Sequence, residues 1–370
     1  MSTFPVIVIG AGQAGLSAAW HLRRKGLRPY LDFLVLDANA RPGGAWQHRW
    51  EELRLGDAHG IHPLPGLPLS DPDPSRPAAE VVSEYYADYE RRFELPVLHG
   101  VPVRSVTRSV DGGFELHTDT RNYTAVSLIN ATGTWDRPFW PSYPGHFAGR
   151  QLHTHDFVSS TEFTGQRVLV VGGGASATQF ILSLRDAGAQ TILSTRRPLD
   201  WREFTGQWGL RVEADVRART RRGLPAGSVV SHTGLALTGP MRQAIDAGWM
   251  DSRGRIDHFD ADGVYFADGS YEPLDAVLWA TGFRPALEHL KELHLRTEHG
   301  GIAVDTVQAF EAPGLYFVGY GASASTLGAT RAGRQAALAA FAQLRDGGLL
   351  PDDPHTPYGE RLAVPAGVGD

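Results

Sequence analysis

The amino-acid sequence predicts an α/β protein built from two similar strand–turn–helix units. Two observations support this prediction: one apolar strand enters a glycine-rich turn at Gly10, and another enters a similar turn at Gly172. Each turn precedes a helical pattern whose small and apolar residues repeat at a spacing that suits packing on a sheet. At 370 residues the chain is long enough for two domains, each with its own core.

The first unit begins with residues 6–9, an apolar run that is typical of a buried parallel strand. Gly10, Gly12 and Gly15 follow directly and form the pattern G-x-G-x-x-G. In a dinucleotide-binding fold these glycines permit a tight turn, the approach of a pyrophosphate and close helix–strand packing. Asp37 ends the next strand and could accept hydrogen bonds from a ribose diol. A glycine-rich turn without a ligand is the alternative, but the complete strand–helix–strand–acid context favours a dinucleotide.

A second group of glycines follows a few residues after Asp37. Gly43 and Gly44 precede Ala45 and Trp46. Two adjacent glycines would let the backbone approach a flat ring closely, and Trp46 could line that ring. A surface turn with one core tryptophan explains the same residues equally well.

Between the two glycine turns the sequence predicts one helix and a small antiparallel sheet. The helix spans about residues 78–92, and the strands span about residues 101–106, 114–118 and 123–129. The last strand runs into residues 130–133, Asn-Ala-Thr-Gly. Such a turn of small residues would let a bound nucleotide pass close to the backbone.

Residues 147–157 have the pattern F-x-G-x-x-x-H-T-x-x-F. Alone, this run is only a loop with two aromatic residues, a glycine and two histidines. Its place between the two glycine turns makes it the crossover between two nucleotide-binding halves. His153 is a candidate general base within it, and a structural role in the linker is the favoured interpretation.

The second unit repeats the first. Residues 167–171 form a buried strand, and Gly172, Gly174 and Ala177 form G-x-G-x-x-A. The next strand ends in Arg196 and Arg197, where the first unit has an aspartate. A pair of arginines could grip a 2′-phosphate, so this site is predicted to prefer NADPH over NADH. An ordinary solvated basic turn is the alternative.

The rest of the chain carries weaker signals. Residues 201–249 show no clear period, whereas residues 276–279 read as a strand that feeds Ala-Thr-Gly at residues 280–282. A short strand at residues 315–319 precedes an alanine-rich helix at about residues 326–344. The positive N-terminal pole of that helix would suit an electron-rich ligand.

Composition excludes several classes of function. The net charge of -6 argues against a nucleic-acid partner, and no apolar run approaches the roughly 20 residues of a membrane span. The N-terminus lacks the pattern of a signal peptide, so we expect a cytoplasmic protein. The chain contains no cysteine, so electron transfer would need a bound organic cofactor. His59 and His62 have no evident third ligand, so no metal site is predicted.

Taken together, these motifs resemble those of the class B flavin-dependent monooxygenases, of the short bacterial kind. The resemblance extends over about residues 6–344. Either glycine motif alone would fit any flavoprotein with two dinucleotide sites, and the run at residues 147–157 is what points to monooxygenases.

The resemblance implies two Rossmann-like domains, with an NADPH domain inserted into a discontinuous FAD domain. The FAD domain would comprise residues 1–150 and 275–345, and the NADPH domain residues 155–272. Residues 346–370 would form a loose C-terminal tail. Whether the protein forms a homodimer is left open by these motifs.

The resemblance also implies the residues at each site. FAD would contact Gly10, Gly12, Gly15, Asp37, Arg41, Gly44, Ala45, Trp46, Val103, Thr132, Gly133, Gly319, Thr326 and Leu327. NADPH would contact Gly172, Gly174, Ala177, Arg196, Arg197 and Thr281. Trp46, Gly56 and His153 are the candidates at the catalytic centre. Gly56 departs from the family, because many members carry an asparagine near this position that is thought to orient NADP+.

The implied reaction uses NADPH to reduce FAD, and the reduced flavin then adds O2 at C4a. The resulting hydroperoxide would pass one oxygen atom to a small sulfide, amine or ketone in a pocket from which water is excluded. An FAD-dependent NAD(P)H reductase without oxygen transfer is the alternative. A disulfide reductase of the same plan needs a cysteine pair, which this chain lacks.

Overall fold

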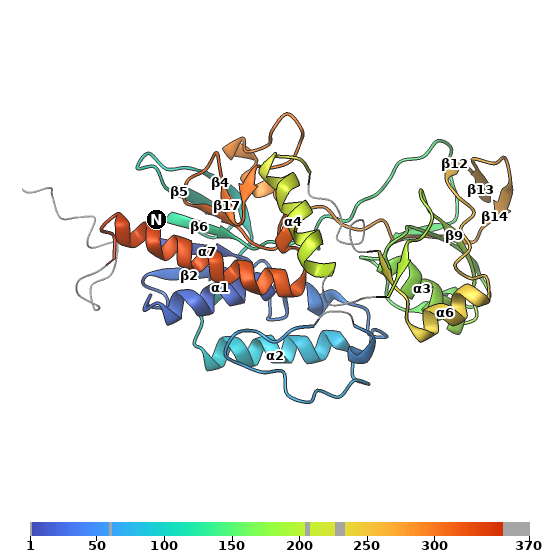
Figure 1. The fold of residues 1–370 in the computed structure, drawn as a ribbon, viewed down its shortest axis with the longest axis horizontal. Helices are drawn as coiled ribbons and strands as arrows, with labels where there is room; N and C mark the ends of the chain where they lie inside the picture. The colour runs from blue at the N-terminus through green and yellow to red at the C-terminus, as the bar shows by residue number, and fades with distance from the viewer. Residues whose placement is uncertain (1, 59–60, 204–207, 226–233, 351–370) are drawn as a thin grey trace, which may run out of the picture.

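The computed structural model describes residues 2–58, 61–203, 208–225 and 234–350, and these residues form two bodies that lie side by side (Figure 1). Each body contains its own sheet, with parallel strands at the centre of the first and a fully parallel arrangement in the second. The sequence-based prediction of an α/β fold with two such units is therefore confirmed.

The first body is built around strand β1 (Ser2–Ile9). β1 pairs in parallel with β2 (Phe33–Leu36) on one side and with β6 (Asn122–Asn130) on the other. The sheet runs in the order β16-β17-β18-β6-β1-β2-β3, and its outer strands are β3 (Val97–Leu98), β16 (Val304–Asp305), β17 (Gln308–Ala309) and β18 (Leu315–Phe317). β4 (Val103–Arg108) and β5 (Phe114–Thr118) extend it from β6 as the predicted antiparallel meander.

Helices α1 (Gln13–Arg24) and α7 (Thr326–Asp346) pack against each other beside this sheet, with α2 (Ala78–Arg92) next to them (Figure 1). The close approach of α1 and α7 depends on small residues. A Cβ atom added at Gly333 of α7 would lie 2.6 Å from the Ala14 carbonyl oxygen of α1. The Ser17 hydroxyl also donates to the Thr330 carbonyl at 2.8 Å, which fixes the two helices relative to each other.

The second body is built on a fully parallel sheet in the order β7-β15-β8-β9. Its strands are β7 (Arg150–His153), β8 (Arg167–Val171), β9 (Gln190–Ser194) and β15 (Ala276–Trp279). The body also contains α3 (Ala175–Asp186), α6 (Gly239–Asp246), the pair β10 (Trp201–Arg202) and β11 (Leu235–Ala236), and the meander β12 (Ile256–Asp260), β13 (Gly263–Phe266) and β14 (Tyr271–Pro273).

Three expectations about the chain path need correction. Residues from 275 onward were expected in the first domain, but β15 pairs with both β7 and β8 in the second sheet. All four residues of β15 are buried, so the strand needs neighbours on both sides. The crossover was expected to be a loop, but its residues 150–153 form edge strand β7. Helix α4 (Trp208–Arg221), expected in the second domain, lies against the first body, where Arg217 contacts Asp305 at 3.1 Å.

The tail at residues 346–370 lies almost entirely outside the described residues, and Asp346 is the last residue of α7. Within the described part of the chain, no helix is long and apolar enough to cross a membrane.

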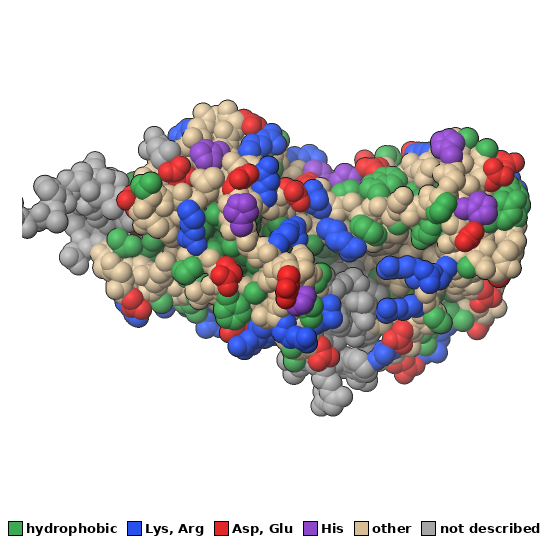
Figure 2. Space-filling view, turned by 90° about the horizontal axis from the view of Figure 1, so that it is seen from above, with side chains coloured by type: hydrophobic (Ala, Val, Ile, Leu, Met, Phe, Trp, Pro, Cys, Tyr) green, Lys and Arg blue, Asp and Glu red, His purple; other side chains and the backbone are tan. Residues whose placement is uncertain are grey.

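Basic side chains gather on one face where the two bodies meet (Figure 2).

Candidate active site

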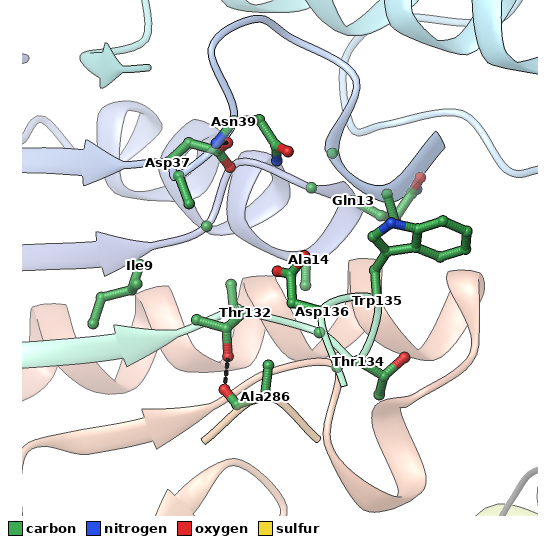
Figure 3. A pocket seen from close by; sticks show the side chains of 18 of the residues that line it. Ile9, Gln13, Ala14, Asp37, Asn39, Thr132, Thr134, Trp135, Asp136 and Ala286 are labelled. Carbon is green, nitrogen blue, oxygen red and sulfur yellow. Dashed lines mark hydrogen bonds between the residues drawn. The ribbon is translucent and has the colours of Figure 1, made fainter. Parts of the chain in front are cut away.

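A pocket of about 560 Å³ opens at the carboxyl end of the first sheet. Ile9 and Leu36 line it at the last residues of β1 and β2, and Val318 lines it just after β18. Figure 3 shows Gln13, Asp37 and other side chains around this space. Ligands of open parallel α/β sheets bind at this edge, so the position matches a dinucleotide site.

The glycines of the first motif shape one wall of this pocket. Gly10 has a φ of 102°, and a Cβ atom there would lie 2.5 Å from the Ala131 carbonyl oxygen. A Cβ atom at Gly15 would lie 1.8 Å from the Gly10 carbonyl oxygen, so Gly15 serves packing and does not line the pocket. Gly12 is the N-cap of α1, makes no side-chain cap and borders open space. The first amides of α1 can therefore receive an anionic group, as a pyrophosphate requires.

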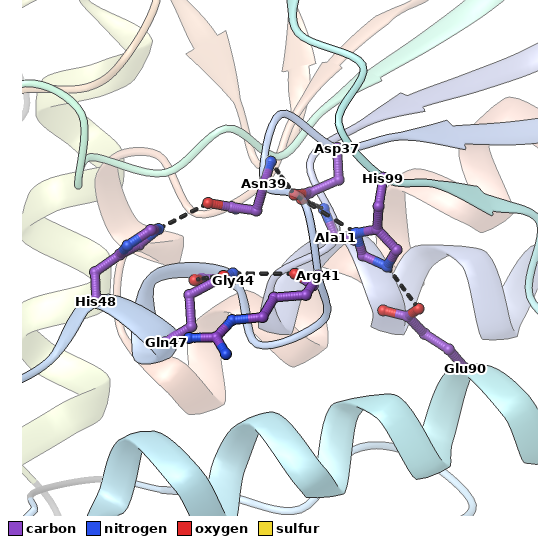
Figure 4. Close-up of polar contacts among 9 residues, drawn as sticks. All are labelled: Ala11, Asp37, Asn39, Arg41, Gly44, Gln47, His48, Glu90 and His99. Carbon is purple, nitrogen blue, oxygen red and sulfur yellow. Dashed lines mark hydrogen bonds and ion pairs between the residues drawn. The ribbon is translucent and has the colours of Figure 1, made fainter.

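Asp37 lies directly after β2 and anchors the loop at the edge of the pocket (Figure 4). Its carboxylate accepts hydrogen bonds from the Ala11 amide at 2.5 Å and from the Asn39 amide at 2.8 Å. Only 4% of Asp37 is exposed. Two backbone amides already hold this carboxylate, so its expected contact with a ribose would use its remaining lone pairs.

Behind Asp37 lies a half-buried histidine, His99, that the sequence did not single out. His99 Nε2 is 2.9 Å from Glu90 Oε2, and its Nδ1 is 4.0 Å from Asp37 Oδ1 (Figure 4). Burial opposes the charged form of His99, but Glu90 and Asp37 outweigh this effect and raise its pKa. Among the described residues, His99 Nδ1 and Glu90 Oε1 have no hydrogen-bond partner.

An aromatic wall with one arginine closes another side of the pocket. Trp46, Arg49 and Trp135 all line it. The Arg49 guanidinium lies 4.5 Å from the centre of the Trp135 ring and 5.8 Å from that of Trp46. Burial lowers the pKa of Arg49 to about 10, and no carboxylate within the described ranges pairs with it. Trp135 also stacks on Phe283 at 5.2 Å.

The structure brings most of the predicted FAD residues into this pocket. In addition to Gly10, Gly12, Asp37 and Trp46, its lining includes Gly44, Ala45, Val103, Thr132, Gly133 and Gly319. Thr132 is oriented by its own hydrogen bond, because its hydroxyl donates to the Ala286 carbonyl at 2.7 Å (Figure 3).

Two other predicted FAD residues, Arg41 and Leu327, are absent from the lining. Arg41 is exposed, and its carbonyl accepts a hydrogen bond from Gln47 at 3.1 Å. Leu327 is 44% exposed, and Thr326 is the first residue of α7. The start of α7 still reaches the pocket through Ser325, which lines it and accepts a hydrogen bond from the Gly328 amide at 3.0 Å.

Gly56, the second candidate at the catalytic centre, lies outside the pocket lining in the short helix η2 (Leu55–Asp57). Its amide donates to the Pro74 carbonyl at 2.9 Å. A Cβ atom at this position would lie 3.2 Å from Pro74 Cβ, so the covering loop would have to shift to accept a side chain. The position of the covering loop therefore depends on the absence of a side chain at Gly56.

His153 at the end of β7 is fully buried and uses both ring nitrogens. Its Nε2 is 3.1 Å from the Gly282 carbonyl oxygen, and its Nδ1 is 3.0 Å from the His155 amide nitrogen. An amide can only donate, so Nδ1 accepts and Nε2 carries the proton. Burial lowers the pKa of His153 to about 4. Such a ring is suited to fixing the crossover rather than to taking a proton.

The second glycine motif has the same local geometry as the first. Gly172 has a φ of 146°, and a Cβ atom there would lie 2.2 Å from the Ala280 carbonyl oxygen. Gly174 is the N-cap of α3, without a side-chain cap and facing open space. Ala177 is fully buried in the core of this body. The Thr281 hydroxyl donates to the Phe139 carbonyl and so joins two connecting segments.

Arg196 and Arg197 follow β9 and line a second pocket of about 420 Å³. This pocket does not include Gly172 or Gly174. In the described ranges no group of three or more metal-binding side chains comes together.

Besides His99, sequence reasoning missed His289 and its contact with Asn130. His289 lines the first pocket, and its Nε2 is 2.7 Å from Asn130 Oδ1. Burial lowers the pKa of His289 to about 4. Asn130 ends β6 in the turn that the sequence indicated, whereas no local pattern marks His289.

Two uncapped helix starts, each following a parallel strand, are the arrangement of a protein with two dinucleotide sites. The model of the pyridine nucleotide-disulphide oxidoreductase family matches residues 7–319. A flavin-containing monooxygenase from Stenotrophomonas maltophilia is 34% identical, with a TM-score of 0.78, over 93% of this chain and 99% of that chain. The chain therefore belongs to the pyridine nucleotide-disulphide oxidoreductases and, among them, to the flavin-containing monooxygenases, a family of FAD- and NADPH-dependent enzymes.

Two curated relatives are more distant. The uncharacterized oxidoreductase CzcO-like from Geobacillus kaustophilus is 26% identical over 322 residues, which cover 85% of this chain and 90% of that protein. Senecionine N-oxygenase from Tyria jacobaeae is 24% identical over 305 residues, which cover 75% of this chain and 58% of that protein. The predicted enzyme class, an FAD-dependent NADPH monooxygenase, is thereby confirmed.

Proposed function

We propose that this enzyme transfers one atom of O2 to a small sulfide, amine or ketone. NADPH supplies a hydride, and one further proton comes from solvent. One oxygen atom enters the product and the other leaves as water, and NADP+ is formed. The observation that carries the proposal is the first pocket, in which the uncapped start of α1 and an aromatic wall face one space. The similarity to the T. jacobaeae N-oxygenase favours a nitrogen nucleophile among these.

The residues present fit FAD. Open space in front of Gly12 leaves room for a pyrophosphate, and a Cβ atom at Gly44 would lie 2.9 Å from the Gly12 Cα. We assign the FAD contacts to the pocket residues, which include Asp37, and to Thr326 at the start of α7, with Arg41 and Leu327 as outer neighbours. Bound flavin supplies hydride acceptance and reaction with dioxygen.

The protein's own contribution is binding, orientation and exclusion of water. Trp46 and Trp135 line the pocket with apolar rings, which would help to exclude water from the reacting centre. His153 stays neutral and hydrogen-bonded at both nitrogens, so we assign it a positioning role in the crossover. Gly56 acts through the shape of the loop that covers this side.

We place NADPH in the second body, with Gly172, Gly174 and Ala177 at the start of α3 and Arg196 and Arg197 beyond β9. Gly174, like Gly12, caps its helix without a side chain and faces open space. This assignment keeps the proposed division into an FAD domain and an inserted NADPH domain, with β15 moved to the latter.

The competing function is an NAD(P)H reductase that returns electrons to O2 without oxygenating a substrate. The observation behind it is Gly56, which offers no side chain where many members of the family carry an asparagine. We would supply the FAD-loaded enzyme with NADPH, 18O2 and a panel of sulfides, amines and ketones, and measure both label in the product and hydrogen peroxide. Incorporation of one labelled atom per NADPH oxidised supports the monooxygenase. Stoichiometric peroxide with every substrate supports the reductase and overturns the proposal.

A further inference from the structure

The second pocket is built by two segments that are far apart in the sequence. One segment follows β9 and contributes Arg196 and Arg197, and the other precedes β12 and contributes Ser252 and Arg255. We propose that Arg255 is a third arginine of the subsite that holds the 2′-phosphate of NADPH, and that it helps to select NADPH over NADH. This inference rests on the proposed placement of NADPH in the second body.

Hydrogen bonds fasten the two segments to each other. The Ser252 hydroxyl oxygen is 3.0 Å from the Thr195 amide nitrogen and 2.8 Å from the Thr195 hydroxyl. The Arg253 amide donates to the Leu193 carbonyl at 2.8 Å. The Ser194 hydroxyl donates to the Gly254 carbonyl, also at 2.8 Å. Arg255 is thus held at a fixed position relative to the end of β9.

The charges around the pocket favour an anion with two negative charges. Arg196, Arg197 and Arg255 line it, and Asp251 is the one carboxylate in the lining. Within the described part of the chain, none of these three arginines forms an ion pair. Like charges that converge on one space repel each other, and a phosphate dianion would relieve that repulsion.

The neighbouring Arg253 does not belong to this group of pocket arginines. Its guanidinium pairs with Glu272 at 3.3 Å, donates to the Ser270 hydroxyl at 3.1 Å and lies over the Phe266 ring at 5.7 Å. Arg253 is absent from the pocket lining. Arg253 and Arg255 are two positions apart, but their charges have different surroundings. Arg253 is neutralised by Glu272, whereas Arg255 lines the pocket without a carboxylate partner among the described residues.

The test compares binding of two probes to the FAD-loaded enzyme by calorimetry. Adenosine 2′,5′-bisphosphate carries the 2′-phosphate, and 5′-AMP lacks it. We expect Arg255→Gln to weaken the bisphosphate about tenfold, the size of one charge-assisted hydrogen bond, and to leave 5′-AMP within about twofold. Arg253→Gln is the matched control and should change neither affinity.

Three outcomes overturn the role of Arg255: no loss of bisphosphate affinity, equal loss for both probes, or equal loss in the Arg253→Gln control. Arg196→Gln separates this inference from the function on which it rests. If Arg196→Gln weakens the bisphosphate and Arg255→Gln does not, only the third arginine is wrong. If neither variant affects the bisphosphate, the proposed 2′-phosphate site itself is wrong, while the 18O2 measurement still decides the reaction.

Discussion

The Glu52 carboxylate accepts hydrogen bonds from Ser160. The Ser160 backbone amide lies 3.1 Å from each carboxylate oxygen, and the Ser160 hydroxyl donates to one of them at 2.7 Å. Glu52 belongs to the loop that follows the aromatic wall of the first pocket, and Ser160 belongs to η3 (Ser160–Phe163) of the second body. Beside this contact, Trp50 packs on Phe180 at 4.6 Å and on Phe157 at 6.2 Å. The loop next to the flavin site is therefore anchored in the body that we assign to NADPH.

Breaking this anchor should separate the two cofactors functionally. Burial disfavours the charge on Glu52, but hydrogen bonds from Ser159 and Ser160 outweigh it and lower its pKa. Glu52→Ala removes those bonds, so we expect the reduction of flavin by NADPH to slow about tenfold while FAD affinity stays unchanged. Anaerobic stopped-flow reduction and FAD titration measure the two quantities. Glu51→Ala, an exposed neighbour, is the control, and an equal effect there would contradict the anchor.

The same pKa gives the anchor a pH dependence. A carboxyl whose pKa is lowered in the folded protein stabilises the fold above the ordinary carboxyl pKa, and this contribution is lost as the pH falls through the lowered value. The difference in melting temperature between the wild type and Glu52→Gln should therefore shrink between about pH 5 and pH 3. A difference that stays constant over this range would count against a charged Glu52.

His99 should make FAD binding depend on pH. Its effect should be lost as the pH rises, whereas that of Glu52 is lost as the pH falls. Its pKa is raised, so its charged form is fully present below its ordinary value of 6.5 and is lost as the pH rises through the higher folded value. Glu90, Asp37 and the Asn39 backbone are the groups that favour this charge. We expect FAD affinity to fall as the pH rises above about 6.5, because Asp37 then loses a neighbouring cation.

His99→Asn should remove most of this pH dependence, and FAD titrations from pH 6 to pH 9 would measure it. His146→Asn, at an exposed histidine, should keep the wild-type profile. If His99→Asn lowers affinity equally at every pH, the side chain matters only for packing.

The sequence was a good guide to the parts of the site that need special backbone geometry. Gly10 and Gly172 could be placed correctly because a side chain at either position would collide with a carbonyl oxygen of a neighbouring strand end. The helix at residues 78–92 was predicted with its observed bounds, since Val82, Tyr86 and Tyr89 repeat on one buried face.

The failures concern contacts between distant segments. β15 was assigned to the wrong sheet because its apolar residues fit any buried strand, and only the pairing with β7 and β8 decides between the two. His99 and Glu90 come together from a loop and a helix, and each looks like an ordinary polar residue in the sequence. Arg255 was overlooked for the same reason, because its role depends on the Ser252–Thr195 contact.

His153 offers a test of the crossover itself. His153→Ala leaves the Gly282 carbonyl and the His155 amide without their ring partners. We expect slower reduction by NADPH, or more peroxide per NADPH oxidised, with FAD still bound. Since burial lowers the pKa of His153 to about 4, the wild-type rate should show no step from this residue between pH 5 and pH 9. Retention of full activity by His153→Ala over that range would refute its positioning role.

Gly333→Ala tests whether packing or helix propensity governs the contact between α1 and α7. Propensity alone favours alanine inside a helix by about 1 kcal/mol. However, the added Cβ would lie 2.6 Å from the Ala14 carbonyl oxygen and 2.9 Å from the Ala18 amide nitrogen, so the helices must separate. Overpacking of this kind costs about 1–3 kcal/mol, and we expect a net loss of stability in urea unfolding. Because Gly12 is the N-cap of α1 and Ser325 is the N-cap of α7, and both line the pocket, FAD affinity should fall together with stability. Gly239→Ala, at a helical glycine with open space around it, should be neutral or stabilising, and equal destabilisation of both variants would show that the interhelical contact is not the cause.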